Sequence, residues 1–220
     1  MSTYHKFYQD SIDNPISFWE EQAKAIQWFQ FPSDILSQDE DELARWYKGG
    51  KLNTSYLALD YHVEQGRGNQ VAIAYDSPVT ETKKQFTYNE LLEEVELVAG
   101  MLSALGVEKG DRVIIYMPMI PETVFAMLAC ARLGAVHSVV FGGFAARELA
   151  IRVDDAHPKV LLMASGGKEI DRIVPYKPIV DAALAEAQHE VEQVVVYQRD
   201  FVAAEMQTGR DLDWEDLRQQ

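Results

Sequence analysis

The sequence is poor in cysteine, in positive charge and in long apolar runs, and each shortage excludes a class of protein. Cys130 is the one cysteine among 220 residues, so no internal disulfide can form and a reducing compartment is expected. The N-terminal stretch MSTYHKFYQDSIDNP has neither the basic nor the apolar region of a signal peptide. The longest apolar runs fall short of the ~20 residues that span a bilayer. We therefore expect a cytoplasmic protein without a membrane partner.

Positive charge is scarce as well. Lysine and arginine number 20 against 35 aspartates and glutamates, which gives a formal net charge of −15. Such a chain does not attract a phosphate backbone or an anionic membrane, so nucleic acid is not an expected partner, although a local basic pocket is compatible with this charge. The five histidines are scattered and predict no metal site. His137 has no partner at triad spacing and is interpreted as a strand residue.

The chain divides into two parts by composition. The first part holds three of the four tryptophans, the acidic run DEDE at residues 39–42, and one clear helical pattern, Asn14 to Trp28, with Pro15 in its first turn. We interpret residues 1–62 as an N-terminal extension and the acidic run as a solvated loop or face. Residues 63–220 carry the pattern of a larger domain, and Cys130 lies in its apolar run VFAMLACARLGA as a predicted core residue.

Short strands alternate with helices in this larger part. Thr87 and Glu90 have the spacing of a capping box, and the helix they predict ends near Gly106. The predicted strands are 71–77, 83–88, 112–117, 136–141, 159–164 and 191–198, and further helices are predicted at 121–133, near 145–155, near 175–187, and from Asp213 onward. Strands that are apolar on both faces and alternate with helices indicate a doubly wound α/β fold with a mostly parallel sheet.

A glycine pair stands where one buried strand meets the next helix, in the sequence Phe141-Gly142-Gly143-Phe144. In an open α/β sheet, ligands bind beyond the carboxyl ends of the strands, and glycine lets a ligand approach the backbone. The pair is equally compatible with a tight turn that has no further role. Both interpretations stay open on local sequence alone.

Two cations, Lys168 and Arg172, follow the glycines that end the next strand. They are expected at the same sheet edge as the Phe-Gly-Gly corner and are candidates for a phosphate site. The alternative is ordinary surface charge paired with Glu169 and Asp171. No Walker A loop or G-x-G-x-x-G fingerprint is present, so a nucleotide site of either kind is not expected.

The run GVEKGDRVIIYMPMIPETVFAMLACARLGAVHSVVFGGFAARELAIRVDDA resembles the N-terminal part of the AMP-forming short-chain acyl-CoA synthetases, the acetyl-CoA and propionyl-CoA synthetase family. The stretches FYQDSIDNPISFWEEQA and GGKLNTSYLALDYHV resemble that family's N-terminal extension. RIVPYKPIVDAAL and GRDLDWEDLRQQ look more like the propionyl-CoA branch. The resemblance implies the first part of an adenylate-forming domain, made of doubly wound sheets and a small barrel.

The same resemblance implies a function. Members of the family join a short carboxylate to ATP with magnesium, which gives an acyl-adenylate, and then transfer the acyl group to CoA. It implies that Phe141, Gly142 and Gly143 meet the adenosine part of CoA and that Arg172 meets its phosphates. Acetyl-CoA synthetases generally carry a second arginine where this chain has Glu169, so Lys168 is the candidate replacement.

The family's phosphate loop, its ATP and magnesium sites and its catalytic lysine are expected beyond residue 220. Taken alone, residues 1–220 are therefore expected to be inactive and to self-associate through the apolar surface that the missing part would cover. The alternative is a standalone CoA-binding or interaction module without catalysis. Acetate and propionate are not distinguished by this part of the sequence.

Overall fold

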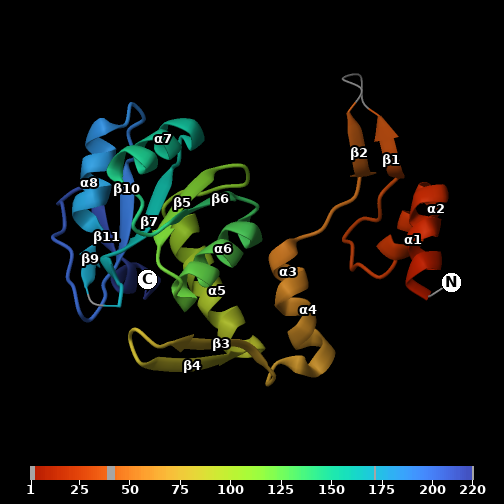
Figure 1. Ribbon diagram of the computed structural model, residues 1–220, viewed down its shortest axis with the longest axis horizontal. Coiled ribbons are helices and arrows are strands. Elements are labelled where there is room, and N and C mark those ends of the chain that lie inside the picture. The colour runs from red at the N-terminus through yellow and green to blue at the C-terminus, as the bar shows by residue number, and fades with distance from the viewer. Residues whose placement is uncertain (1–2, 39–42, 171, 220) are drawn as a thin grey trace. The chain divides into compact units, whose positions relative to one another are not determined.

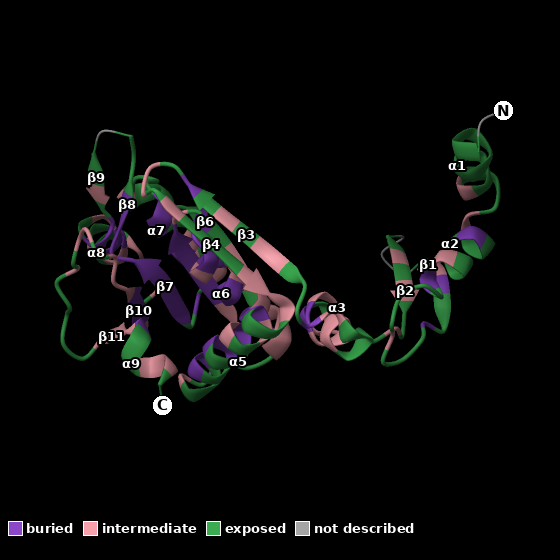
Figure 2. Ribbon diagram, turned by 90° about the horizontal axis from the view of Figure 1, so that it is seen from below, coloured by how far each residue is buried: buried purple, intermediate pink, exposed green. Residues whose placement is uncertain are grey.

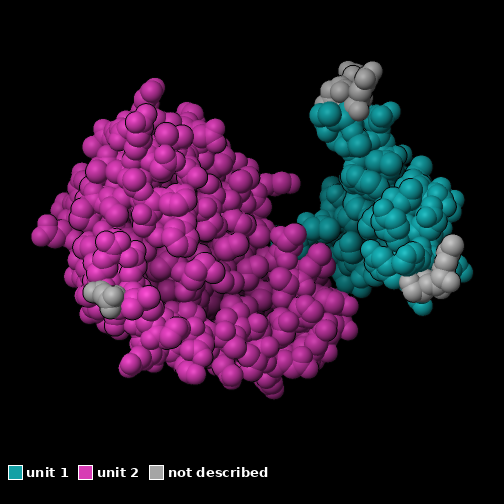
Figure 3. Space-filling view, viewed as in Figure 1, with its two compact units in different colours: residues 1–53 teal, residues 54–220 magenta. Residues whose placement is uncertain are grey.

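The protein is represented by a computed structural model that describes residues 3–38, 43–170 and 172–219. By compactness it divides into two units, residues 1–53 and residues 54–220 (Figure 3). The acidic run at 39–42 lies outside the described residues. The sequence predicted a different boundary, between an extension of residues 1–62 and a domain of residues 63–220, and that division stays a prediction.

The first unit contains two helices and a hairpin: α1 (Thr3–Asp13), α2 (Pro15–Ala23), β1 (Asp34–Gln38) and β2 (Ala44–Lys48), the strands being antiparallel. The helix predicted from Asn14 to Trp28 is too long. It begins at Pro15, whose missing N–H costs nothing in a first turn, and ends at Ala23. Beyond it the chain turns back, and the indole Nε1 of Trp28 donates to the carbonyl of Ala23 at 2.9 Å.

The second unit is an α/β domain. Its helices are α3 (Thr54–Ala58), α4 (Asp60–His62), the π-helical turn η1 (Val63–Arg67), α5 (Tyr88–Ala104), α6 (Pro121–Leu133), α7 (Ala146–Ala156), α8 (Lys177–Glu186) and α9 (Trp214–Arg218). Its strands are β3 (Val71–Ser77), β4 (Thr82–Thr87), β5 (Arg112–Met117), β6 (Val136–Phe141), β7 (Val160–Ala164), β8 (Gly166–Lys168), β9 (Ile173–Pro175), β10 (Gln193–Tyr197) and β11 (Asp211–Asp213).

Five of these strands form one parallel sheet in the order β11-β10-β7-β5-β6. The chain moves from β5 outward to β6 and then back past β5 to β7 and β10, and right-handed crossovers therefore put α6 on one face and α7 and α8 on the other (Figure 1). The predicted α/β class, a parallel sheet flanked by helices, is confirmed. β3 and β4 pair separately as an antiparallel hairpin.

The core of this unit lies in the central strands. Every residue of β7 is buried, and so are all those of β5 after Arg112 (Figure 2). Burial on both faces explains why these strands read as continuous apolar runs without alternation. Cys130, on α6, is fully buried in the same core, and burial raises the pKa of its thiol to about 12. Its predicted role as a core residue is confirmed.

Helix ends follow the side-chain signals. The backbone N–H of Thr87 donates to Glu90 at 2.7 Å, while the Glu90 N–H donates to the Thr87 hydroxyl, which is the predicted capping box. Asp213 caps α9 by accepting from the N–H groups of Glu215 and Asp216. The sequence pattern missed β11, because three residues give too short a run to show a strand periodicity.

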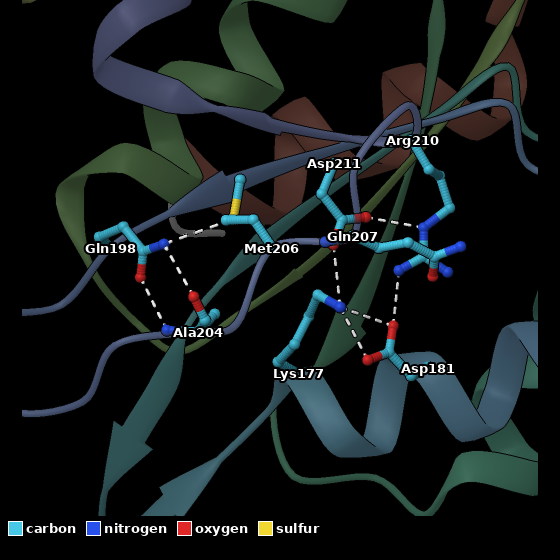
Figure 4. Close-up of polar contacts among 8 residues, drawn as sticks. All are labelled: Lys177, Asp181, Gln198, Ala204, Met206, Gln207, Arg210 and Asp211. Carbon is cyan, nitrogen blue, oxygen red and sulfur yellow. Dashed lines mark hydrogen bonds and ion pairs between the residues drawn. The ribbon is translucent and has the colours of Figure 1, made fainter.

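A network of charges around the buried pair Lys177 and Asp211 attaches β11 to α8 (Figure 4). The Lys177 Nζ lies 2.7 Å from Asp181 and 2.9 Å from Asp211, and Arg210 contacts both carboxylates at 2.6 and 2.7 Å. The side chain of Asp211 has no exposed surface. Burial raises its pKa, but hydrogen bonds from Arg210, the Gln207 N–H and Lys177 outweigh burial and leave the pKa below its ordinary value.

We predict that Lys177→Met lowers the free energy of unfolding by about 3 kcal/mol, because it leaves a buried carboxylate short of one counter-charge. Urea unfolding followed by circular dichroism measures the change. Lys83→Met is the matched control, since the Lys83–Asp76 pair is exposed and should contribute less than about 1 kcal/mol.

The pH dependence provides a second check. Because the folded pKa of Asp211 lies below its unfolded value, the stabilisation is present above about pH 4 and is lost as the pH falls through the folded pKa. The difference between wild type and Lys177→Met should therefore shrink below pH 4. Equal effects of the two lysine substitutions at pH 7 would contradict the role of the network.

Candidate functional site

Three strands of the parallel sheet end at the same edge. Met117 of β5 is paired with Phe141 of β6, and Tyr116 is paired with Met163 of β7. The segments that follow these strands therefore emerge side by side. Two of them are the Phe-Gly-Gly corner after β6 and the Ser-Gly-Gly-Lys segment after β7. The sequence prediction that both segments lie at one edge agrees with this register.

The corner is a tight turn. The Phe144 N–H donates to the carbonyl of Phe141 at 3.2 Å, and Gly143 has a φ of +105°. A side chain at Gly143 would meet open space but would be strained by this φ, so glycine is required for backbone geometry. The Phe141 side chain is 66% exposed and lies beside the ring of Phe144. The corner thus presents one aromatic face and open backbone.

Tyr116 of β5 fixes the corner by hydrogen bonds to its backbone. Its hydroxyl accepts from the Gly143 N–H at 3.0 Å and donates to the carbonyl of Phe144 at 2.9 Å. Tyr116 itself is fully buried in the central strand. Burial raises the pKa of its phenol, and the hydrogen bond from Gly143 opposes this only in part. The hydroxyl therefore stays neutral and can donate and accept at once.

Glycine is required at position 142 for packing, which the sequence did not show. A Cβ at Gly142 would lie 2.7 Å from the ring of Tyr176, and a Cβ at Gly167 would overlap the Tyr176 hydroxyl. The ring thus occupies the space beside both glycines and is itself 5% exposed. The expectation that glycine admits a ligand to the backbone does not hold at the Cβ side of Gly142, because Tyr176 fills it.

Lys168 and Arg172 lie in an antiparallel hairpin that the sequence did not predict. β8 and β9 pair from Gly166 to Lys168 and from Ile173 to Pro175. Arg172 is 72% exposed at the side chain, and its Nε donates to Glu169 at 2.7 Å. This hydrogen bond and the charge of Glu169 raise the pKa of Arg172. Of the pairing expected for ordinary surface charge, the Arg172–Glu169 ion pair is present, and Asp171 lies outside the described residues.

The same edge of the sheet also holds a polar recess that the sequence did not predict. It encloses about 160 Å³ and is lined by side chains from the β3–β4 hairpin, the start of α6 and the end of β10, among them Lys84, Glu122, Tyr197 and Arg199. Burial and the neighbouring Glu122 carboxylate raise the pKa of Tyr197. The signal was weak in the sequence, because these residues come from three distant segments.

Among residues 3–38, 43–170 and 172–219, no group of three or more His, Cys, Asp or Glu side chains is arranged to hold a metal ion. Within the same ranges no helix is both long enough and apolar enough to cross a bilayer.

A parallel α/β sheet flanked by helices, with a glycine corner and the β8–β9 hairpin at its carboxyl edge, places this domain in the doubly wound α/β class. Family comparisons identify it further. Residues 60–219 match the AMP-binding enzyme family, and residues 4–58 match the acetyl-coenzyme A synthetase N-terminus family. The chain therefore belongs to the AMP-binding enzyme family, as the sequence resemblance predicted.

Individual relatives agree with this family. Human mitochondrial acyl-CoA synthetase short-chain family member 3 is 45% identical over 98% of this chain and 32% of its own length. Propionate–CoA ligase from Salmonella typhimurium is 43% identical over 99% of this chain and 35% of its own length. The solved structure of acetoacetyl-CoA synthetase from Streptomyces lividans superposes with a TM-score of 0.86 at 27% identity, over 99% of this chain and 33% of that one. The chain thus spans about a third of the length of these relatives.

We predict opposite stability effects for two glycine-to-alanine substitutions. Gly167→Ala should lower the free energy of unfolding by about 1 to 3 kcal/mol, because the new methyl group displaces the buried ring of Tyr176. Gly100→Ala is the control, since Gly100 lies within α5 with open space around it. It should raise the stability by about 0.5 to 1 kcal/mol. Chemical denaturation measures both, and a stabilising Gly167→Ala would rule out the proposed packing of Tyr176.

Proposed function

We propose that this chain is the N-terminal part of an acid–CoA ligase that acts on propionate or acetate. In the first step, a carboxylate oxygen attacks the α-phosphorus of ATP and displaces pyrophosphate, which leaves the acyl-adenylate as the product. In the second step, the thiol of CoA attacks the acyl carbon, and AMP leaves. The observation that carries the proposal is the family match along residues 4–58 and 60–219, together with the names of the human and Salmonella relatives.

The contribution of these residues is to bind CoA, and we propose no catalytic residue among them. Phe141 and Gly143 receive the adenosine part, since Phe141 offers an exposed ring and Gly143 faces open space, while Gly142 packs on Tyr176 and holds the corner in place. Arg172 and Lys168 receive the phosphates. ATP and Mg²⁺ are bound by residues that follow residue 220, which also supply the adenylation chemistry.

The ion pair between Arg172 and Glu169 has to open when a phosphate of CoA binds to Arg172. Glu169 holds the guanidinium of Arg172 at 2.7 Å, at a site exposed to solvent. Exposed ion pairs are weak, typically below about 1 kcal/mol, so a phosphate can displace the carboxylate. A phosphate can accept two parallel hydrogen bonds from the guanidinium, whereas Glu169 accepts one from Nε, and the phosphate carries more charge. Glu169 therefore competes with the ligand for Arg172 and weakens CoA binding without abolishing it.

The cytoplasmic location expected from the sequence stays a proposal, since the name of the human relative places that protein in mitochondria. A standalone CoA-binding module without catalysis remains the alternative function. It shares the same corner and hairpin, and enzymatic assay of the complete gene product distinguishes the two.

We predict that the complete gene product forms AMP from ATP when propionate or acetate and CoA are supplied, and that residues 1–220 alone do not. Both proteins are assayed side by side for AMP by chromatography. AMP formation by residues 1–220 would contradict the assignment of the chemistry to later residues. CoA binding by a complete gene product that forms no AMP would favour the binding module.

The isolated residues 1–220 used in that assay should also self-associate. Val136, Val139 and Phe141 of β6 are each 45% or more exposed, and within the described residues β6 is an end strand of its sheet. An apolar end strand is a template for pairing with another chain. Light scattering that shows only monomer at high concentration would contradict this expectation.

We predict opposite effects on CoA affinity for the two partners of the hairpin ion pair. In the complete protein, Arg172→Ala should raise the dissociation constant of CoA about 10-fold, the loss expected for a charged hydrogen bond. Glu169→Gln should lower it about 3-fold by freeing the guanidinium. Calorimetric titration of CoA measures both values.

Lys83→Ala is the control for that titration, because it removes an equally exposed cation from an ion pair in the β3–β4 hairpin. Its affinity for CoA should equal that of the wild type. If Arg172→Ala and Lys83→Ala have the same effect, the hairpin does not hold the phosphates.

A further inference from the structure

Two tyrosines connect the corner to the hairpin. We infer that Tyr116 and Tyr176 are positioning residues that hold the Phe-Gly-Gly corner and the β8–β9 hairpin at one separation, so that a single CoA molecule can contact both. This inference rests on the proposed function. The two residues do not touch the ligand themselves, since both are 5% exposed or less. They act through the backbone of the segments that do.

Tyr116 fixes the corner to the sheet. It stands one residue before the end of β5, the strand that lies between β6 and β7. Its hydroxyl accepts from the backbone of Gly143 and donates to that of Phe144, so both sides of the turn are fixed to one side-chain oxygen. The turn thereby keeps the left-handed conformation of Gly143 and aims the open side of its backbone at solvent.

Tyr176 fixes the hairpin to the corner. Its ring lies against the Cα atoms of Gly142 and Gly167, and any side chain at either position would overlap it. One rigid ring therefore spaces the corner from β8, which carries Lys168 at its end. The rings of Tyr116 and Tyr176 meet edge to face at a centroid distance of 5.2 Å. The corner, the two rings and the hairpin form one packed stack.

Ser165 anchors the other side of this stack. The Tyr176 N–H donates to the carbonyl of Ser165 at 3.0 Å, and the Ser165 hydroxyl donates to Val202 at 2.6 Å while accepting from the Arg199 N–H at 2.8 Å. Ser165 is 1% exposed. Tyr176 directly follows β9, and Ser165 thus ties it to the end of β7 and to the segment after β10.

This arrangement matches the needs of a long ligand with two recognised ends. An aromatic base at Phe141 and phosphates at Arg172 can be bound together only if the two segments keep a constant separation. Packing at the tip of the hairpin does not ensure this, because the side chains of Arg172 and Glu169 are 72% and 55% exposed. The buried tyrosine ring supplies the rigidity instead. A misplacement of about 1 Å can lower the rate of a step that depends on ligand position by about 100-fold.

The test uses the complete gene product and separates the two half-reactions. Formation of the acyl-adenylate is followed by propionate-dependent ATP–pyrophosphate exchange, which requires no CoA. Tyr176→Leu should raise the KM for CoA by about 10- to 100-fold and leave this exchange within 2-fold of wild type. Tyr176→Phe keeps the ring that spaces the two glycines and should restore the KM to within about 3-fold.

Tyr116→Phe removes the hydroxyl that fixes the corner and retains the packed ring. It should raise the KM for CoA by about 3- to 10-fold, the equivalent of one lost hydrogen bond. Phe125→Leu is the control for general loosening of the core, since Phe125 is 3% exposed on α6 and packs on Phe86. Its KM for CoA should stay at the wild-type value even if its melting temperature falls.

The outcomes distinguish this inference from the proposed function. If Tyr176→Leu keeps both the ATP–pyrophosphate exchange rate and the KM for CoA of the wild type, the positioning role alone is overturned. Equal losses of exchange and of the CoA step in Tyr176→Leu would overturn it as well, because they indicate a purely structural residue. Absence of acid-dependent exchange in the unmodified protein would overturn the proposed function itself.

Discussion

Everything at the candidate site depends on the parallel register of β5 with its two neighbours. Strands that run in the same direction and end together deliver their following segments to one edge, whatever those segments contain. The register is held by burial, since β5 and β7 have apolar side chains on both faces and a slipped pairing would leave cavities in the core. The corner and the hairpin therefore lie close together because of packing in the core of the sheet, which does not involve a ligand.

The charge of the chain sets a second constraint. Residues 1–220 carry a net charge of −15, which disfavours the anion that we propose they bind, so the attraction must be local. The hairpin carries the cations Lys168 and Arg172 and an equal number of carboxylates, and Glu169 is paired with Arg172. An internal carboxylate keeps the guanidinium oriented when no ligand is present, and it also limits how tightly a phosphate is held. Such a site favours exchange of ligand over very tight binding.

The long, strongly patterned elements were predictable from the sequence and the short ones were not. The bounds of β5, α6 and β6 match the predicted ranges because apolar runs, a proline at the helix start and a glycine at its end mark them. β8, β9 and β11 have three residues each, and their pairing depends on contacts across the chain. The roles of Gly142 and Gly167 escaped for the same reason, since Tyr176 lies far from Gly142 in sequence.

The two glycines of the corner illustrate why a motif has to be interpreted residue by residue. Gly142 is required because a buried ring fills the space of its side chain, and Gly143 is required because its backbone adopts a φ of +105° beside open space. The first requirement would exist without any ligand. The second leaves an unobstructed backbone next to an exposed phenylalanine, and packing within the described chain does not account for that opening. The ligand-binding interpretation of the corner therefore rests on Gly143 and Phe141, while Gly142 belongs to the scaffold that holds them in place.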